Sequence, residues 1–195
     1  RAQGETVFTG YDFLETEPRI LGLILDGAPV QKAVVGQTVE VILAGVAAGE
    51  DVSTWVASSG KTPLDYVMSQ VAAGKASDVG DLSKAAFVAV ATGQNPRSFG
   101  GVDLVSRMSA QQNLATGQYG DTLFKHAYVV LALHNAGAPV PESAVTAMTA
   151  QFTDDGAWAL FGGTTPGIAD TNTTALVMQA LVAVGRPDAA AGAIP

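Results

Sequence analysis

A repeat of about 44 residues constrains the fold of this chain more than any other feature. Four segments of eleven residues are rich in Ala, Val and Leu, are apolar over most of a helical circumference, and end in glycine. They span residues 39–49, 83–93, 127–137 and 175–185. Their last residues are Gly49, Gly93, Gly137 and Gly185, which gives spacings of 44, 44 and 48 residues. Similarity at a fixed period of this length is typical of repeat architectures.

Each repeat is predicted to be a helical hairpin. A helix that is apolar on nearly all sides is expected to be buried, and the closing glycine suits the left-handed position that follows a helix C-terminus. A more amphipathic outer helix is expected near residues 62–73, 103–112 and 141–152. The sequence therefore predicts an all-α fold, an array of about four hairpins that each pair one buried helix with one outer helix.

The first 37 residues do not follow the repeat. Their apolar run from Ile20 to Leu25 is too short for periodicity to distinguish a strand from a helix. We therefore predict two parts, an atypical N-terminal cap or arm over residues 1–37 and a helical-hairpin repeat domain over residues 38–195. The opening residues lack the apolar core of a signal peptide.

Composition limits the partners. The net charge is −8, which argues against a nucleic-acid partner, and no run approaches the roughly 20 apolar residues of a transmembrane helix. Charged residues make up 14% of the chain, against roughly 25% in ordinary domains. Either another protein covers much of this surface, or the chain is simply a helical protein rich in Ala. The absence of cysteine excludes disulfides, thiolate metal ligands and a cysteine nucleophile.

Two of the joints between hairpins share a pattern of Gln, four residues, Gly, one residue and an aromatic residue. The residues are Gln112, Gly117 and Tyr119 in one joint, and Gln151, Gly156 and Trp158 in the other. The pattern resembles the QW motif of the terpenoid cyclase and protein prenyltransferase superfamily, whose α/α toroids are rings of helical hairpins. Over residues 37–188 the chain is most similar to bacterial prenyltransferase/squalene oxidase repeat proteins, and the same toroid recurs in cobalamin carriers of the intrinsic factor and transcobalamin type.

This resemblance implies a toroid-like array in which the motif joins neighbouring hairpins and has no catalytic part. The glutamine is expected to bond to a helix end, the aromatic ring to stack, and the glycine to allow a sharp turn. Six hairpins would need more residues than this chain has, so we expect an open arc.

The resemblance also implies where a cyclase would carry its acid. In cyclases that begin by protonation, an Asp-x-Asp-Asp-Thr-Ala motif supplies the proton, and the corresponding run here begins at Asp170. The proton-donating position is Asn172, which has no acidic proton, and the supporting position is Thr173. Asp170 is kept as a candidate acid, although a structural role competes with that interpretation.

That structural role is helix capping. Asp78 lies fifteen residues before Gly93, Asp121 sixteen before Gly137, and Asp170 fifteen before the last closing glycine. An acidic side chain at the start of a helix accepts hydrogen bonds from free backbone N–H groups and complements the positive end of the helix dipole. We therefore predict that these three residues cap the buried helices.

No metal or cofactor site is predicted. The zinc site that protein prenyltransferases would imply needs cysteine, and the only histidines, His126 and His134, lie eight residues apart on one helix and so about 12 Å apart. We interpret both as helix-surface or core residues. Asp154 and Asp155 could contribute to a cation-binding loop but match no calcium template. No Gly-x-Ser-x-Gly turn supports a hydrolase triad.

The predicted function is therefore that of a non-catalytic, extracytoplasmic or cell-surface module for protein contact, with a protein partner or copies of itself, assembling into a fibre or oligomer. One alternative is a small-molecule carrier, either of a cobalamin-like ligand or of a small apolar ligand such as an isoprenoid. The other alternative is a polyprenyl cyclase-like enzyme.

Overall fold

The computed structural model of the chain describes residues 32–193, with side chains from residue 38 onward. The predicted all-α class is confirmed, because every regular element within residues 32–193 is a helix. The chain divides into two compact units, Arg1–Gln70 and Val71–Pro195. The predicted N-terminal arm over residues 1–37 lies almost wholly outside the described residues, as does the run from Ile20 to Leu25.

The first unit contains helix α2 (Lys32–Ala47), the short 3-10 helix η1 (Val52–Thr54) and most of α3 (Pro63–Ala72). The η1 segment packs against α2, and Gly45 makes room for this contact, because a Cβ there would collide with the Trp55 indole. The start of α3 is a capping box. The Thr62 amide donates to Asp65 Oδ2 at 2.9 Å, and the Asp65 amide donates to Thr62 Oγ1 at 3.1 Å.

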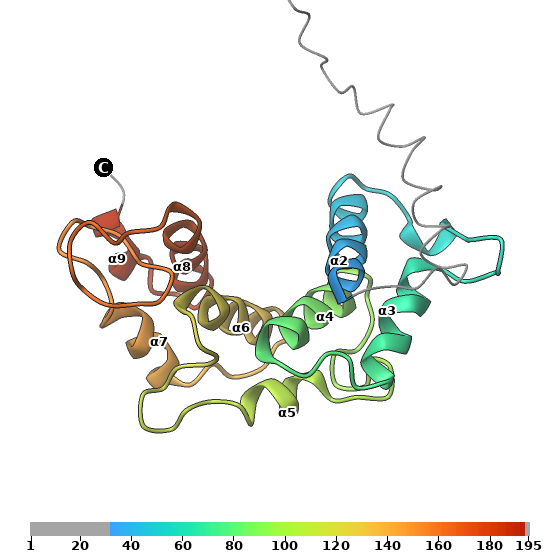
Figure 1. Cartoon of the computed structure of the whole chain (residues 1–195), viewed down its shortest axis with the longest axis horizontal. Helices are drawn as coiled ribbons and strands as arrows, with labels where there is room; N and C mark the ends of the chain where they lie inside the picture. The colour runs from blue at the N-terminus through green and yellow to red at the C-terminus, as the bar shows by residue number, and fades with distance from the viewer. Residues whose placement is uncertain (1–31, 194–195) are drawn as a thin grey trace, which may run out of the picture. The chain divides into compact units, whose positions relative to one another are not determined.

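The second unit consists of inner helices, outer helices and short C-terminal turns. Its elements are α4 (Val79–Ala91), α5 (Leu104–Ser109), α6 (Leu123–Asn135), α7 (Glu142–Thr149), α8 (Thr171–Ala183), α9 (Pro187–Ala190) and η2 (Ala191–Ala193). Helix α4 packs against α6, and α6 packs against α8, so that the three inner helices form a row (Figure 1). Helix α5 packs on α4, α7 on α6 and α9 on α8.

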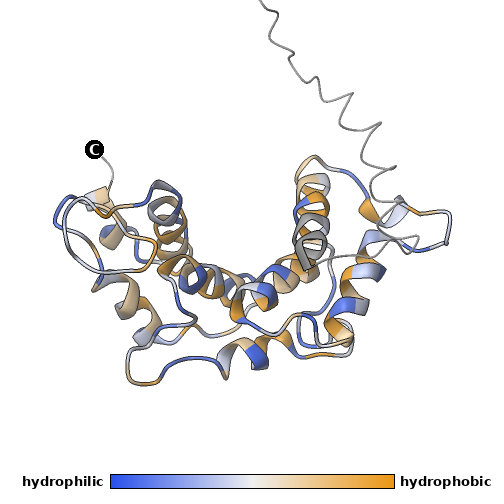
Figure 2. Cartoon of the chain, viewed as in Figure 1, coloured by the Kyte–Doolittle hydropathy of each residue, from blue (hydrophilic) through white to orange (hydrophobic). Residues whose placement is uncertain are grey.

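Small side chains line the core of this row. Ala86 and Ala89 on α4, Ala127 on α6 and Ala180 on α8 are fully buried, and apolar residues run along α6 and α8 (Figure 2). Alanine at these positions lets neighbouring helix backbones approach closely while preserving helix propensity. The alanine-rich composition therefore has a structural use in the second unit.

The inner helices end as the repeat predicts. Helices α4, α6 and α8 each stop two residues before their closing glycine, and Gly93, Gly137 and Gly185 have φ values of +69°, +63° and +79°. The amide after Gly93 donates to the Ala89 carbonyl at 2.7 Å, the pattern of a Schellman cap. In the first unit, Gly49 has a φ of +83° after α2.

Two of the three outer helices are shorter than predicted, whereas α3 (Pro63–Ala72) fills the expected range 62–73 to within one residue at each end. Helix α5 covers Leu104–Ser109 and α7 covers Glu142–Thr149, whereas the expected ranges ran to residues 112 and 152. The difference arises because the residues that follow each helix form the joints described below. The toroid arrangement itself stays a prediction.

Candidate functional site

The first joint, residues 112–119, lies between α5 and α6 and is held by Gln112. This residue and Tyr119 form an isolated antiparallel bridge. The Gln112 Nε2 group donates to the Gly117 carbonyl at 2.9 Å and to Ser143 Oγ at 3.1 Å. Gly117 has a φ of +76°, and a Cβ there would collide with the Ser143 carbonyl oxygen. The glutamine thus connects the joint to the start of α7, and the glycine allows the two backbones to touch.

The second joint, residues 151–158, follows α7 and is built in a related way. The Gln151 Nε2 group donates to the Ala147 carbonyl at 2.6 Å and to Gln118 Oε1 at 3.3 Å. The buried Trp158 indole donates from Nε1 to the Met148 carbonyl at 2.9 Å and packs against the Phe152 ring at a centroid distance of 4.7 Å. Gly156 turns the chain with a φ of +83°. In both joints the side chains fasten helix ends.

His126 connects the first joint to its surroundings. Its Nδ1 atom accepts a hydrogen bond from the Tyr119 amide at 2.9 Å, and its Nε2 atom lies 2.9 Å from the Ala144 carbonyl. The ring is fully buried and stacks on Tyr119, with 5.7 Å between ring centroids. Burial lowers the pKa of His126, and the hydrogen bond to Ala144 partly offsets this effect. The expectation of a core histidine fits this position, whereas His134 is exposed near the end of α6.

The hydroxyl of Tyr119 is buried and has no hydrogen-bond partner. Burial raises the pKa of Tyr119, so the phenol stays neutral. Because an unpaired buried hydroxyl carries a desolvation cost, the ring is held here by its stacking and by the backbone bond to His126.

Two of the three expected acidic caps are caps in the structure. The Asp78 side chain accepts a bond from the Asp81 amide, and that of Asp170 accepts one from the Thr173 amide. Helix α6 differs from this prediction, because its N-cap is Thr122, whose hydroxyl accepts from the Lys125 amide at 3.1 Å. Asp121 instead forms an ion pair with the Lys125 side chain at 3.0 Å.

The geometry of Asp170 opposes a role as an acid. Hydrogen bonds from the Thr173 hydroxyl and amide hold the pKa of the Asp170 carboxyl below its usual range. A general acid needs a raised pKa so that it still carries its proton at the working pH. Asn172 is exposed on the first turn of α8, and Thr173 is buried.

The described residues bring together no group of three His, Cys, Asp or Glu side chains that could hold a metal ion. Asp155 accepts a hydrogen bond from the Gly167 amide at 2.8 Å and so closes the long loop before α8. The neighbouring Asp154 is exposed. Neither residue is placed in a ligand shell.

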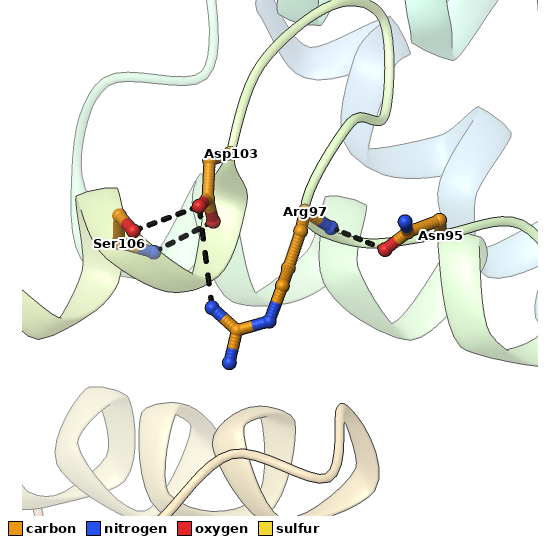
Figure 3. A network of polar contacts seen from close by, with 4 residues as sticks. All are labelled: Asn95, Arg97, Asp103 and Ser106. Carbon is orange, nitrogen blue, oxygen red and sulfur yellow. Dashed lines mark hydrogen bonds and ion pairs between the residues drawn. The ribbon is translucent and has the colours of Figure 1, made fainter.

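A polar network that was not predicted from the sequence lies at the start of α5 (Figure 3). The Asp103 carboxylate accepts bonds from the Ser106 amide at 2.9 Å and from its hydroxyl at 2.8 Å, and Arg97 Nη1 lies 4.0 Å from Asp103 Oδ2. The spacing Asp-x-x-Ser before an apolar run was the available signal for this cap. The Asp103 side chain is 38% exposed and the Arg97 side chain 48% exposed, so the network is a solvated helix start.

No model of a known protein family matches the chain, and no solved structure matches it. Short stretches do match curated proteins. An alanine–tRNA ligase from Leifsonia xyli subsp. xyli is 56% identical over 59 residues, which covers 28% of this chain and 7% of the ligase. The alanine–tRNA ligase of Clavibacter michiganensis subsp. michiganensis is 63% identical over 43 residues, and that of Renibacterium salmoninarum is 54% identical over 43, each covering 22% of this chain and 5% of the ligase.

These matches overturn the predicted function. A non-catalytic extracytoplasmic module for protein contact or self-assembly was expected, with a small-molecule carrier or a cyclase-like enzyme as alternatives, but the matching proteins are tRNA ligases. The expectation that the chain is not an enzyme conflicts with the same finding. The prediction was wrong because the repeat and the low charge describe how the chain packs, and a surface poor in charge does not identify what binds it.

The partner predictions have different outcomes. Among the described helices, none is long and apolar enough to cross a membrane, which confirms that part of the prediction. The exclusion of nucleic acid rests on net charge alone and stays a prediction. The location outside the cytoplasm also stays a prediction, resting on the family resemblance.

Proposed function

We propose that this chain takes part in the attachment of alanine to tRNA, as a component related to alanine–tRNA ligases. The observation that carries the proposal is the identity of 56% over 59 residues to the Leifsonia xyli subsp. xyli ligase. Similar stretches of 43 residues in the ligases of Clavibacter michiganensis subsp. michiganensis and Renibacterium salmoninarum support it. The proposal does not depend on a single relative, because three ligases match at 54–63% identity.

The chain is proposed as a component because it spans about 5–7% of the length of these relatives. A matched stretch of 59 residues is also shorter than the unit Val71–Pro195, so the match cannot account for the whole of that unit. We propose that the hairpins form a second module, similar to those of the α/α-toroid superfamily. The 44-residue spacing of Gly49, Gly93 and Gly137 and the row of α4, α6 and α8 support this part of the proposal.

A charging assay with radiolabelled alanine and unfractionated tRNA tests the first part directly. Filter binding of the chain to labelled alanine tRNA, with a tRNA for another amino acid as the control, tests it independently of catalysis. Both measurements are made at low salt. A chain with a net charge of −8 gains little tRNA affinity from phosphate contacts, and that contribution weakens further as the salt concentration rises. Charging, or a preference for alanine tRNA, supports the proposal. Failure of both overturns it.

The second part is tested by the arrangement of the hairpins. A crystal structure of the whole chain is expected to show successive inner helices turning in one direction, as in an arc of a toroid. A straight stack of hairpins would contradict it.

A further inference from the structure

The side chain of His126 joins three segments of the second unit. It stands on α6, accepts a hydrogen bond from the Tyr119 amide of the first joint, and contacts the Ala144 carbonyl on α7. The same joint reaches α7 through Gln112, which donates to Ser143 Oγ, and through the close approach of Gly117 to the Ser143 carbonyl. The imidazole is therefore part of the connection between the joint and the α6–α7 hairpin.

The repeat contains an internal comparison for this residue. His126 lies eleven residues before Gly137, and Thr174 lies eleven before Gly185. The Thr174 hydroxyl accepts a hydrogen bond from the Trp158 amide at 3.0 Å, just as His126 Nδ1 accepts one from the Tyr119 amide at 2.9 Å. Both repeats thus use a side chain of the inner helix to hold the amide of the motif aromatic. Only the first of these acceptors can titrate.

The two bonds assign the tautomer of the His126 ring. A backbone N–H can only donate, so Nδ1 must carry a lone pair, and the Ala144 carbonyl can only accept, so Nε2 must carry the proton. Protonation would place a hydrogen on Nδ1, which removes the acceptor and opposes the Tyr119 N–H. The bond between the joint and α6 therefore exists only with the neutral ring.

Charged groups on the elements that surround His126 form their ion pairs with one another and not with the imidazole. The joint contributes Tyr119, which stacks on the ring. Asp121, between the joint and α6, pairs with Lys125 of α6. Helix α7 contributes Glu142, which is paired with Arg186 at 2.9 Å. Helix α8 has no titratable residue within its bounds, and its N-cap is Asp170, which is bonded to Thr173. The remaining groups are Asp78, Asp81 and Lys84 at the start of and along α4, and Tyr128 and His134 on α6.

We propose that His126 is an acid-sensitive latch, which holds the first joint against α6 and α7 while the ring is neutral and releases it when the ring is protonated. The equivalent contact in the next repeat, between Trp158 and Thr174, stays closed under the same conditions. The two joints therefore differ in their response to acid although they share one architecture.

The pH window follows from the direction of the shift. Burial lowers the pKa of His126 in the folded chain below the value of about 6.5 for an exposed histidine. The neutral ring therefore contributes its full stabilisation above about pH 6.5, and this contribution is lost as the pH falls toward the pKa of the folded state. Over that interval the equilibrium constant for opening rises by up to about tenfold per pH unit.

Hydrogen exchange of two amides in the unmodified chain tests the latch. Protection of the Tyr119 amide, corrected for the intrinsic pH dependence of exchange, is expected to fall as the pH drops below about 6.5. Protection of the Trp158 amide, bonded to Thr174, is expected to stay constant. An unchanged Tyr119 amide overturns the proposal, and so does an equal loss at both amides.

Two variants test the assignment to this histidine. His126→Thr installs the acceptor of the next repeat and is expected to abolish the pH dependence of Tyr119 protection, although it leaves the Ala144 carbonyl without its partner. His134→Gln removes the only other histidine and is expected to preserve that dependence. The proposal would be overturned if the pH dependence of Tyr119 protection persisted in His126→Thr, or if it were lost in His134→Gln. If His126→Thr does not fold, the comparison of the Tyr119 and Trp158 amides in the unmodified chain still tests the proposal.

Discussion

At the scale of single residues, the start of α6 shows how closely the repeat constrains chemistry. Thr122 lies fifteen residues before Gly137, the same offset that separates Asp78 from Gly93 and Asp170 from its closing glycine. The position keeps its register in the repeat while the residue type changes, and the hydroxyl performs the capping that a carboxylate performs elsewhere. Asp121 attracted attention in the sequence because it is acidic, yet it lies one residue outside the capping position.

Replacing Thr122 and Asp121 one at a time tests which of the two residues caps α6. Thr122→Ala removes the acceptor for the Lys125 amide and is expected to lower the free energy of unfolding by about 1 kcal/mol. Asp121→Ala removes only an exposed ion pair with Lys125 and is expected to have a smaller effect. Urea unfolding followed by far-UV circular dichroism measures both variants. A larger loss in Asp121→Ala would assign the cap to the carboxylate instead.

Glycines at positive φ differ in what surrounds them, and a pair of substitutions measures that difference. At Gly137, φ is +63° and no atom lies within 4 Å of the place that an added methyl group would take, so Gly137→Ala carries only the backbone cost, about 1–2 kcal/mol. At Gly117, φ is +76° and the added methyl would also collide with the Ser143 carbonyl. Gly117→Ala is therefore expected to lower the free energy of unfolding by more than Gly137→Ala in the same urea experiment. Equal losses of unfolding free energy in the two variants would mean that α7 shifts to accommodate the added methyl group without an energetic cost.

At the scale of elements, the helices were predictable and the joints were only partly so. Apolar residues on all sides and a closing glycine indicate a buried helix. Helices α4 and α6 follow that pattern, whereas α8 buries one face and leaves Val182 56% exposed. Two of the outer helices, α5 and α7, were predicted too long because the residues that follow them are compatible with a helix. Their actual conformation depends on contacts distant in sequence, such as Gln151 with Gln118 and Trp158 with Thr174. Periodicity contains no information on such contacts.

The indole of Trp158 fastens the second joint to α7, and removing its N–H tests that role. Trp158→Phe removes the 2.9 Å indole bond to the Met148 carbonyl, which keeps only the Gln151 amide at 3.2 Å, and leaves unfilled space around a buried ring. We expect a loss of about 2 kcal/mol or more in the free energy of unfolding. Phe161→Leu is the matched control, because Phe161 is 76% exposed in the loop that follows and should change stability by less than about 0.5 kcal/mol. Similar effects of the two variants would show that the indole bond contributes nothing.

At the scale of the whole molecule, fold and function were predictable to different extents. The helical class followed from a pattern that repeats along the chain, whereas the relation to tRNA ligases depends on a match of 59 residues to known proteins, which periodicity cannot reveal. Capping residues, QW-like joints and a buried histidine all describe how hairpins are held together. None of them brings a reacting group to a substrate, so reasoning from packing led to a structural function.

The division of the chain at residues 70 and 71 predicts where a protease acts first. Lys61 and Lys75 are exposed outside helices, whereas Lys84 and Lys125 are half-buried within α4 and α6. Because cleavage needs locally unfolded chain, a lysine-specific protease at low dose is expected to cut at Lys61 and Lys75 before the other lysines whose side chains the structure describes. The product from residue 76 to the C-terminus should keep its helical circular dichroism, since α4, α6 and α8 pack within one unit. Early cleavage at Lys84 or Lys125, or loss of helicity in that product, would mean that the second unit needs the first to fold.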